Sequence, residues 1–213
     1  GSAVGLDSGS SPAHWELASR MNPGVPVFSS ETYPGWLTHW GEKWARPDTA
    51  QLMKEVRFLM DNKKSFNFYV IHGGTNFGFT AGANSGRKGY EPDVTSYDYD
   101  APVDEQGLPT HKYIKIREII GSYLPKGKKL PSIPEPIPAI EIPMIFPAKF
   151  TSLWDNLPQP VLSDTPKSFE AYGQDYGFIL YQTELIGHKA GKLTVTNIHD
   201  YATVFLNGVF VGT

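Results

Sequence analysis

The chain has 213 residues, 40% of them hydrophobic, and a formal net charge of −3 at pH 7. This length predicts one large domain or two small ones, and the slightly negative charge excludes the basic footprint of a nucleic-acid-binding protein. Cysteine is absent, which excludes disulfides, thiolate catalysis and cysteine-ligated metals. No apolar stretch is long enough to span a bilayer, so we expect no membrane partner.

The first part of the sequence alternates short apolar strands with amphipathic helices. Residues 3–7 predict the end of a strand, residues 12–21 a short helix and residues 25–30 a second strand. Asp48 predicts the N-cap of a further helix, because apolar residues recur after it at helical spacing. Residues 66–71 form a nearly continuous apolar run, which is typical of a strand buried on both faces. This order predicts a parallel sheet covered by helices.

A long loop rich in glycine and asparagine follows the third strand, at residues 72–109. It would lie on the carboxyl side of the sheet, where α/β barrels build their active sites. Loops of this length in compact domains are usually functional or disordered, and its tyrosines and glycines favour a function. Thr110 can then cap another helix.

Prolines recur every few positions in residues 125–147, which excludes a helix and favours extended polyproline geometry. We interpret this region as a semi-rigid connection between domains. A ligand for a proline-recognising module is the less favoured alternative.

The composition becomes β-rich after the prolines. Asn207-Gly208 is a strong signal for a tight hairpin turn, and the segment after it predicts the returning strand. Three segments predict strands: 177–183, 192–196 and 202–208.

Glu31 closes the second predicted strand and is followed at once by aromatic residues, in the segment 27–41, VFSSETYPGWLTHWG. A strand end holds a side chain more rigidly than a loop does, which suits a nucleophile. Aromatic faces beside it suit a bound sugar ring. The residues alone leave a second interpretation open, in which Glu31 is an exposed loop carboxylate beside a structural aromatic cluster.

Three ordered motifs carry a resemblance to a known family. Residues 30–41 match the pattern Ser-Glu-x-Tyr-x-Gly-Trp-x-x-x-Trp-Gly. Residues 73–78 with 82–84 are similar to an eighth-strand loop, and residues 95–102, TSYDYDAP, are similar to the next substrate loop. The chain thereby resembles glycoside hydrolase family 35, the β-galactosidase family. Residues 170–185 also resemble the β-domain that follows the barrel in that family.

The resemblance implies an α/β fold: part of a TIM (β/α)8 barrel, followed by part of an all-β, sandwich-like domain. We expect residues 1–125 to be the C-terminal portion of the barrel, residues 126–150 a proline-rich linker, and residues 151–213 the start of a galactose-binding-like β-sandwich. A closed barrel needs eight βα units and a sandwich about seven strands, more than this sequence offers. We therefore expect the chain to be an internal fragment of a longer protein.

The resemblance also implies roles for individual residues. Glu31 is the expected nucleophile of a retaining mechanism, which uses two carboxyl groups about 5 to 5.5 Å apart. Tyr33 and Tyr99 are expected in the galactose pocket, as candidate hydrogen-bond donors to Glu31, and Trp36 is expected to supply the stacking face. Core packing is the alternative for each of these three aromatic residues.

Polar residues of the long loop are expected to order it. By resemblance Asp98 and Asp100 hold the loop rather than act as the general acid. Asn76 and Asn84 are expected to fix its shape, with glycines that permit left-handed backbone. The histidines show no metal-binding spacing and the glycines no phosphate-binding pattern, so we expect no metal and no cofactor.

The acid/base carboxylate of the family lies in an Asn-Glu-Tyr-Gly segment, and no Asn-Glu dipeptide occurs in this sequence. The resemblance implies a β-galactosidase that removes terminal β-linked galactose with retention, acting on a β-galactoside substrate. An exo-β-glucosaminidase is the neighbouring specificity. We expect little or no hydrolysis by this polypeptide alone. The alternatives are a non-catalytic carbohydrate-binding module and an inert fragment.

Overall fold

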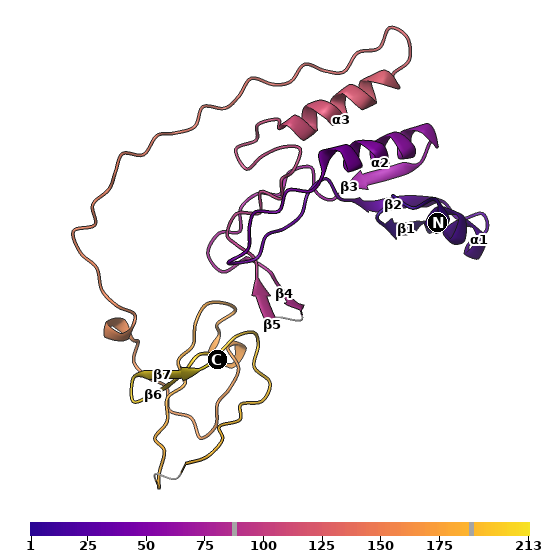
Figure 1. The fold of residues 1–213 in the computed structure, drawn as a ribbon. Coiled ribbons are helices and arrows are strands. Elements are labelled where there is room, and N and C mark those ends of the chain that lie inside the picture. The colour runs from indigo at the N-terminus through magenta and orange to yellow at the C-terminus, as the bar shows by residue number, and fades with distance from the viewer. Residues whose placement is uncertain (87–88, 188–189) are drawn as a thin grey trace. The chain divides into compact units, whose positions relative to one another are not determined.

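The computed structural model describes residues 1–86, 89–187 and 190–213, and Figure 1 shows it as a ribbon. The chain divides into two compact units, Gly1–Ala139 and Ile140–Thr213. The regular elements of the first unit are β1 (Val4–Asp7), α1 (Pro12–Met21), β2 (Val27–Thr32), α2 (Thr49–Asp61), β3 (Ser65–Phe68), β4 (Ala83–Gly86), β5 (Gly89–Pro92) and α3 (His111–Ser122).

The strands β1, β2 and β3 form a parallel sheet in that order. Helix α1 joins the first two strands and α2 joins the second to the third, so the predicted strand–helix alternation and parallel sheet are confirmed. Asp7 pairs with Glu31 across β1 and β2, and Thr32 pairs with Phe68 across β2 and β3. Since parallel strands all point the same way, their carboxyl ends meet at one edge, and Glu31 lies at that edge.

The helices begin largely where local chemistry predicts. Helix α1 carries Pro12 in its first turn, where a missing N–H is tolerated. Asp48 caps α2 by accepting a hydrogen bond from the Ala50 N–H at 2.8 Å. Thr110 precedes α3, but its hydroxyl does not cap the helix. It donates instead to the carbonyl oxygen of Pro102 at 2.9 Å, so it ties α3 to the preceding loop.

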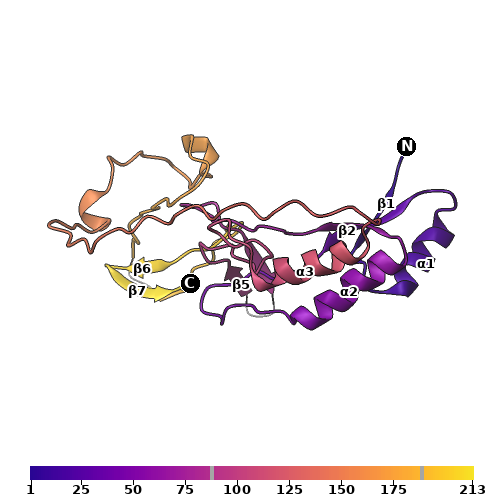
Figure 2. The same ribbon diagram turned by 90° about the horizontal axis from the view of Figure 1, so that it is seen from above.

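Helices α2 and α3 lie side by side in both ribbon views (Figures 1 and 2). Their facing side chains form the core of this unit, and Phe68 of β3 packs against it. Each such side chain contributes about 1.5 to 3 kcal/mol by leaving water. The buried core residues are Leu52, Val56, Ile116 and Ile119.

The third strand differs from its prediction. β3 ends at Phe68 rather than continuing to residue 71, and its side chains alternate between exposed and half-buried. Among the described residues β3 pairs only with β2, so it is an edge strand and its faces are incompletely covered. Beyond it the Tyr69 N–H still donates to the Thr32 carbonyl oxygen at 2.9 Å.

The long loop contains a hairpin that the sequence did not predict. Strands β4 and β5 pair antiparallel, with Asn84 opposite Glu91. Their residues are mostly glycine and polar, without the apolar alternation that indicates a strand. The loop is therefore a folded region rather than a simple connection.

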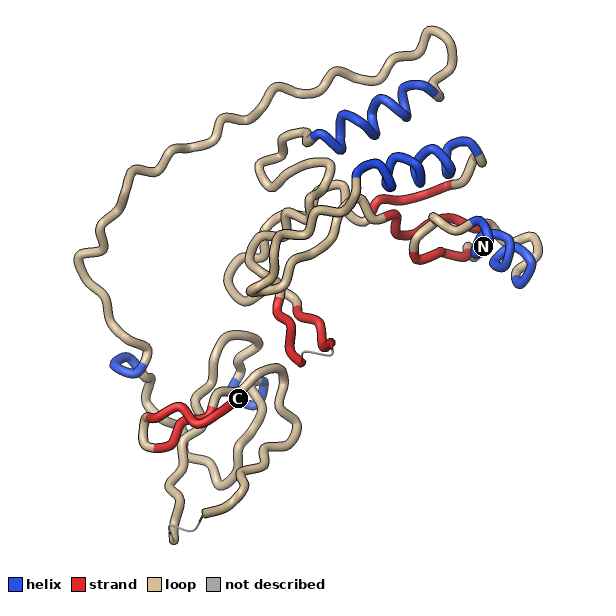
Figure 3. Tube along the Cα trace, viewed as in Figure 1, coloured by secondary structure: helices blue, strands red, loops and turns tan. Residues whose placement is uncertain are grey.

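The second unit has little regular structure, as Figure 3 shows by its colouring. It contains two short 3-10 helices, Trp154–Asn156 and Glu170–Tyr172, and a hairpin of β6 (Val204–Leu206) and β7 (Val209–Gly212). The predicted turn at Asn207 and Gly208 is confirmed, because both residues have positive φ, 51° and 78°.

Two of the predicted strands in this unit are wrong. Segments 177–183 and 192–196 contain no strand. β-rich composition predicts a strand only where a partner completes the hydrogen-bond ladder, and no sheet includes either segment.

Candidate active site

Glu31 lies in β2 and is partly buried. Its strand neighbours Ser29 and Thr32 are fully buried, and their hydroxyls hydrogen-bond to each other at 2.9 Å. The Ser30 hydroxyl donates across the sheet to the Leu6 carbonyl oxygen at 3.0 Å. These contacts fix the end of β2 and tie the backbone that carries Glu31 to β1.

The Tyr33 hydroxyl is the direct partner of Glu31. It lies 2.7 Å from Glu31 Oε2 and also donates to Asp7 Oδ1. Burial raises the pKa of Tyr33 well above its ordinary value, and the hydrogen bonds to Asp7 and Glu31 raise it further. The phenol therefore keeps its proton at neutral pH and acts as a donor.

Trp36 offers an open aromatic face beside this pair. Its ring centroid lies 5.5 Å from that of Tyr33 in an edge-to-face arrangement, and 6.4 Å from that of Tyr99. Its side chain is 49% exposed, so it is not a core residue. An exposed indole next to a fixed carboxylate can stack on a sugar ring.

Tyr99 lies buried beside Trp36. It is 4% exposed. Burial is the largest cause that raises its pKa, and electrostatic repulsion from Tyr97, Tyr69 and Glu31 raises it further. In the part of the chain that the structure describes, no hydrogen bond joins Tyr99 to Glu31. Tyr33 thus fills the donor role expected of both tyrosines, and Tyr99 acts on Glu31 only through their electrostatic interaction.

Two further tyrosines complete the aromatic cluster. Tyr69 follows β3, with its ring 6.2 Å from Tyr33 and 6.1 Å from Tyr99. Tyr97 stacks on Tyr99 at 5.3 Å and hydrogen-bonds to Tyr69. Neither residue was predicted from the sequence to belong to the site. Tyr69 lies inside the apolar run of residues 66–71, which predicted a buried strand position for it rather than a place in the site.

The loop that carries Tyr97 and Tyr99 is held by close backbone contacts. A Cβ atom on Gly73 would lie 1.8 Å from the Tyr97 carbonyl oxygen, and the Tyr97 N–H donates to the Gly74 carbonyl oxygen at 2.9 Å. Glu105 accepts hydrogen bonds from Thr75 at 2.5 Å and from Ser96 at 2.6 Å. One carboxylate thereby clamps the segments after β3 and β5 together.

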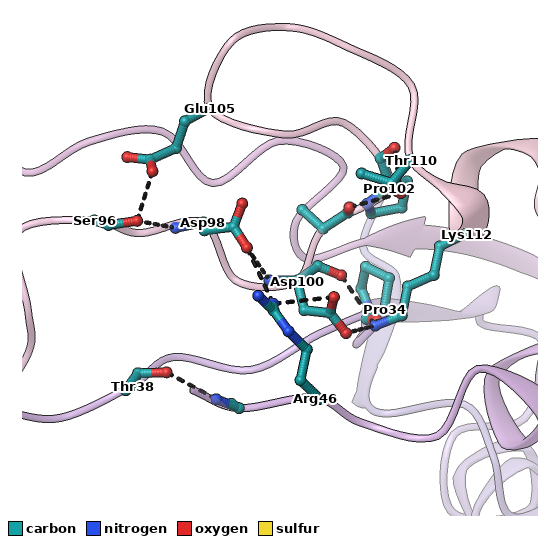
Figure 4. Close-up of polar contacts among 12 residues, drawn as sticks. Pro34, Thr38, Arg46, Ser96, Asp98, Asp100, Pro102, Glu105, Thr110 and Lys112 are labelled. Atoms are coloured by element: carbon teal, nitrogen blue, oxygen red, sulfur yellow. Dashed lines mark hydrogen bonds and ion pairs between the residues drawn. The ribbon is translucent and has the colours of Figure 1, made fainter. Parts of the chain in front are cut away.

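Asp98 and Asp100 are both engaged in ion pairs, as Figure 4 shows. Arg46 Nη1 lies 3.2 Å from Asp98 Oδ2 and 3.1 Å from Asp100 Oδ1. The buried Lys112 ammonium pairs with Asp100 and donates to the carbonyl oxygen of Pro34 at 2.6 Å. Both carboxylates are thus tied to cations that fix the loop.

The two asparagines occupy structural positions in the same region. Asn84 Oδ1 lies 2.9 Å from His39 Nε2, and the Asn76 N–H donates to the Thr95 carbonyl oxygen at 2.7 Å. His39 also contacts Glu42 at 3.0 Å. Its pKa is raised, first by the hydrogen bond to Asn84 and then by Glu42, while burial opposes the shift.

Within residues 1–86, 89–187 and 190–213, no group of three or more histidine, aspartate or glutamate residues could hold a metal ion. None of the helices described is long and apolar enough to cross a bilayer. The chemistry that the site can offer is that of a fixed carboxylate, phenol donors and aromatic faces.

Comparison with known proteins agrees with this chemistry. The family model for glycosyl hydrolases family 35 matches residues 2–123, and the model for the first all-beta domain of beta-galactosidase matches residues 166–213. These two matches together extend over most of the chain.

Curated relatives include a beta-galactosidase of Xanthomonas manihotis, 37% identical over 98% of this chain and 35% of that protein. Beta-galactosidase 17 of Arabidopsis thaliana is 37% identical over 97% of this chain and 31% of its own length. Beta-galactosidase-1-like protein 2 of Homo sapiens is 37% identical over 88% of this chain and 30% of its own. The chain thus spans about a third of the length of these relatives. Because the family model matches residues 2–123, which is more than half of the chain, the chain belongs to glycosyl hydrolases family 35.

Proposed function

We propose that this chain is part of a β-galactosidase that hydrolyses terminal β-linked galactose with retention, and that Glu31 is its nucleophile. One observation carries the proposal: in a family 35 chain, Glu31 is the penultimate residue of the parallel strand β2, with the Tyr33 hydroxyl 2.7 Å from its carboxylate. The 49% exposed Trp36 ring beside them supplies a stacking face. The β-galactosidase names of the relatives support galactose as the sugar.

The proposed roles follow from the contacts. Glu31 attacks the anomeric carbon, and Tyr33 orients the attacking oxygen by its hydrogen bond. Trp36 stacks on the galactose ring, while Tyr99 forms the buried wall behind it. A rigid wall keeps the sugar in the reactive orientation, which accounts for a large share of the rate in such reactions.

The proposal includes the larger fold. We assign residues 1–125 to the last βα units of a TIM barrel and residues 126–150 to a linker. Residues 151–213 then begin the following β-domain. The parallel order β1-β2-β3, with α1 and α2 as connections, supports the barrel assignment.

In this proposal the acid/base carboxylate is not among these 213 residues. Asp98 and Asp100 are bound to Arg46 and Lys112, and the sequence lacks the Asn-Glu dipeptide of the family. We therefore expect the isolated polypeptide to release little or no nitrophenol from an aryl β-galactoside. Release by pure polypeptide at an ordinary enzymatic rate would contradict this assignment.

The full-length protein that contains this chain tests the proposal. Glu31→Gln should lower turnover of nitrophenyl β-galactoside by at least about a thousandfold, while galactose affinity changes only a few-fold. Glu16→Gln is the matched control, because Glu16 is exposed on α1. Undiminished turnover by Glu31→Gln would refute the nucleophile assignment. A wild-type protein that cleaves an aryl β-glucosaminide instead would refute the assignment of a β-galactoside as the substrate.

A further inference from the structure

A second carboxylate reaches the hydroxyl that contacts the nucleophile. Asp7 ends β1 and is the register partner of Glu31 in the neighbouring strand. The Tyr33 hydroxyl is within hydrogen-bonding distance of both, at Asp7 Oδ1 and at Glu31 Oε2. Asp7 could not be identified from the sequence, because its place beside Tyr33 depends on the register of β1 and β2.

Asp7 and Glu31 compete for the same hydrogen bond from the Tyr33 hydroxyl. A phenol has one proton, so it donates one strong hydrogen bond at a time. The raised pKa of Tyr33, caused first by burial and then by Asp7 and Glu31, keeps that proton on the phenol. Whichever carboxylate is the better acceptor receives the bond. The balance therefore depends on how much negative charge Glu31 carries.

That charge changes during the reaction proposed above. When Glu31 attacks, its oxygen forms a bond to the anomeric carbon as the bond from that carbon to the leaving oxygen breaks. The electron pair of the broken bond stays on the leaving oxygen, which takes a proton from the acid/base carboxyl outside this chain. Glu31 becomes a neutral ester and a poorer acceptor. Water then attacks the anomeric carbon and gives a proton to the acid/base carboxylate, while the bond from that carbon to Glu31 breaks and leaves its electron pair on Glu31, which is an anion again.

We propose that Asp7 is a positioning residue that receives the Tyr33 hydrogen bond as Glu31 loses its charge. The hydroxyl rotates from Glu31 to Asp7 on formation of the ester and returns on its hydrolysis, and the proton never leaves Tyr33. Asp7 thereby keeps the bond to Glu31 from overstabilising the free nucleophile, and it offers an anionic acceptor in the transition state. The inference rests on the proposed function of Glu31.

The test separates the two chemical steps. In the full-length protein, the burst of dinitrophenol from a dinitrophenyl β-galactoside reports ester formation, and the steady-state rate reports ester hydrolysis. Asp7→Asn should slow the burst about tenfold. The steady-state kcat should stay within about twofold of wild type, since the better-stabilised carboxylate is not a poorer leaving group.

A double-mutant cycle shows whether Asp7 acts through Tyr33. In a Tyr33→Phe background, Asp7→Asn should change the burst by less than about twofold. Asp61→Asn is the matched control, because Tyr123 donates to Asp61 at 2.6 Å in another tyrosine–aspartate pair of this unit. It should leave both phases unchanged.

Each outcome has a distinct meaning. A wild-type protein without galactosidase activity contradicts the proposed function, not the role of Asp7. An active wild type with an unchanged burst in Asp7→Asn overturns the inference, as does an equal loss in the Tyr33→Phe background. Asp7 is exposed, so Asp7→Asn should fold. If thermal unfolding shows otherwise, Asp7→Glu, which keeps the anion, should restore the burst, and failure to do so overturns the inference.

Discussion

The carbonyl oxygen of Tyr99 occupies the space that a side chain at Gly35 would need. A Cβ atom on Gly35 would lie 1.5 Å from that oxygen, and the Trp36 N–H donates to the same oxygen at 3.0 Å. The segment after β2 and the loop of Tyr99 therefore pack backbone against backbone. Only glycine permits this approach, which sets the rings of Trp36 and Tyr99 side by side.

Gly35→Ala should break this contact. Because the new methyl group would overlap backbone rather than a movable side chain, we expect a loss of at least about 2 kcal/mol in unfolding free energy. Thermal unfolding of the full-length protein measures it. Gly121→Ala is the control, since a Cβ there meets only the Leu130 side chain at 3.5 Å within a helix. Equal melting temperatures for the two variants would contradict the packing argument.

Lys112→Met should destabilise the site loop. The buried ammonium pairs with Asp100 and donates to two carbonyl oxygens, those of Pro34 at 2.6 Å and Asp100 at 2.9 Å. Its removal leaves these acceptors unsatisfied, which should cost about 3 kcal/mol. Denaturant unfolding of the full-length protein checks this value.

The control for that experiment is Lys115→Met on the same helix. The Lys115 side chain is 43% exposed and, among the described residues, pairs only with Glu118 at 3.0 Å, so its loss should change stability by less than about 1 kcal/mol. If the two lysine variants unfold at the same denaturant concentration, the buried ammonium does not have the stabilising role that we assign to it.

Trp36→Ala should weaken substrate binding. The half-exposed indole is proposed to stack on galactose, and its loss should lower kcat/KM about tenfold, mainly through KM. Steady-state kinetics with nitrophenyl β-galactoside measures it. Trp44→Ala is the matched control, because Trp44 is 51% exposed and has no ring contact with the tyrosine cluster in the described structure. Parallel losses in both variants would argue against a specific stacking role.

His39 should make stability depend on pH. Its folded-state pKa is raised above the ordinary 6.5, with the hydrogen bond to Asn84 as the largest cause and Glu42 and Asp93 adding to it. A raised pKa means that the folded state favours the proton. The stabilisation is then fully present below about pH 6.5 and is lost as the pH rises through the folded-state pKa.

Melting temperatures at pH 6 and pH 8 test whether the stabilisation by His39 decreases as the pH rises. The wild type should lose more stability than His39→Gln between the two values, whereas His14→Gln, at an exposed position of α1, should follow the wild type. A wild type that gains stability relative to His39→Gln as the pH rises would contradict the direction.

Elements that depend only on neighbouring residues could be predicted from the sequence. The helix Pro12–Met21 has the predicted bounds, Asp48 caps α2, and the Asn207-Gly208 turn forms. These features depend on capping, spacing and turn preferences within a few residues. The parallel order of the sheet also followed, because alternating strands and helices leave few other arrangements.

Contacts between distant segments were not predictable in the same way. The expectation for 177–183 and 192–196 was wrong because a strand needs a partner, which composition does not specify. Tyr69 and Asp7 were not predicted from the sequence, because their positions beside Tyr33 depend on strand register and on the fold of the loop. Glu31 could be proposed from the sequence because it follows an apolar run and lies in a recognisable motif.

The most direct measurement is the identity of the residue that carries the covalent intermediate. The full-length protein is treated with a 2-deoxy-2-fluorogalactosyl fluoride, which forms the ester faster than water can hydrolyse it, and the peptides are sequenced by mass spectrometry. We expect one fluorogalactosyl group on Glu31, and none in the Glu31→Gln protein. A label on any other residue, or on Glu31→Gln protein, would contradict it.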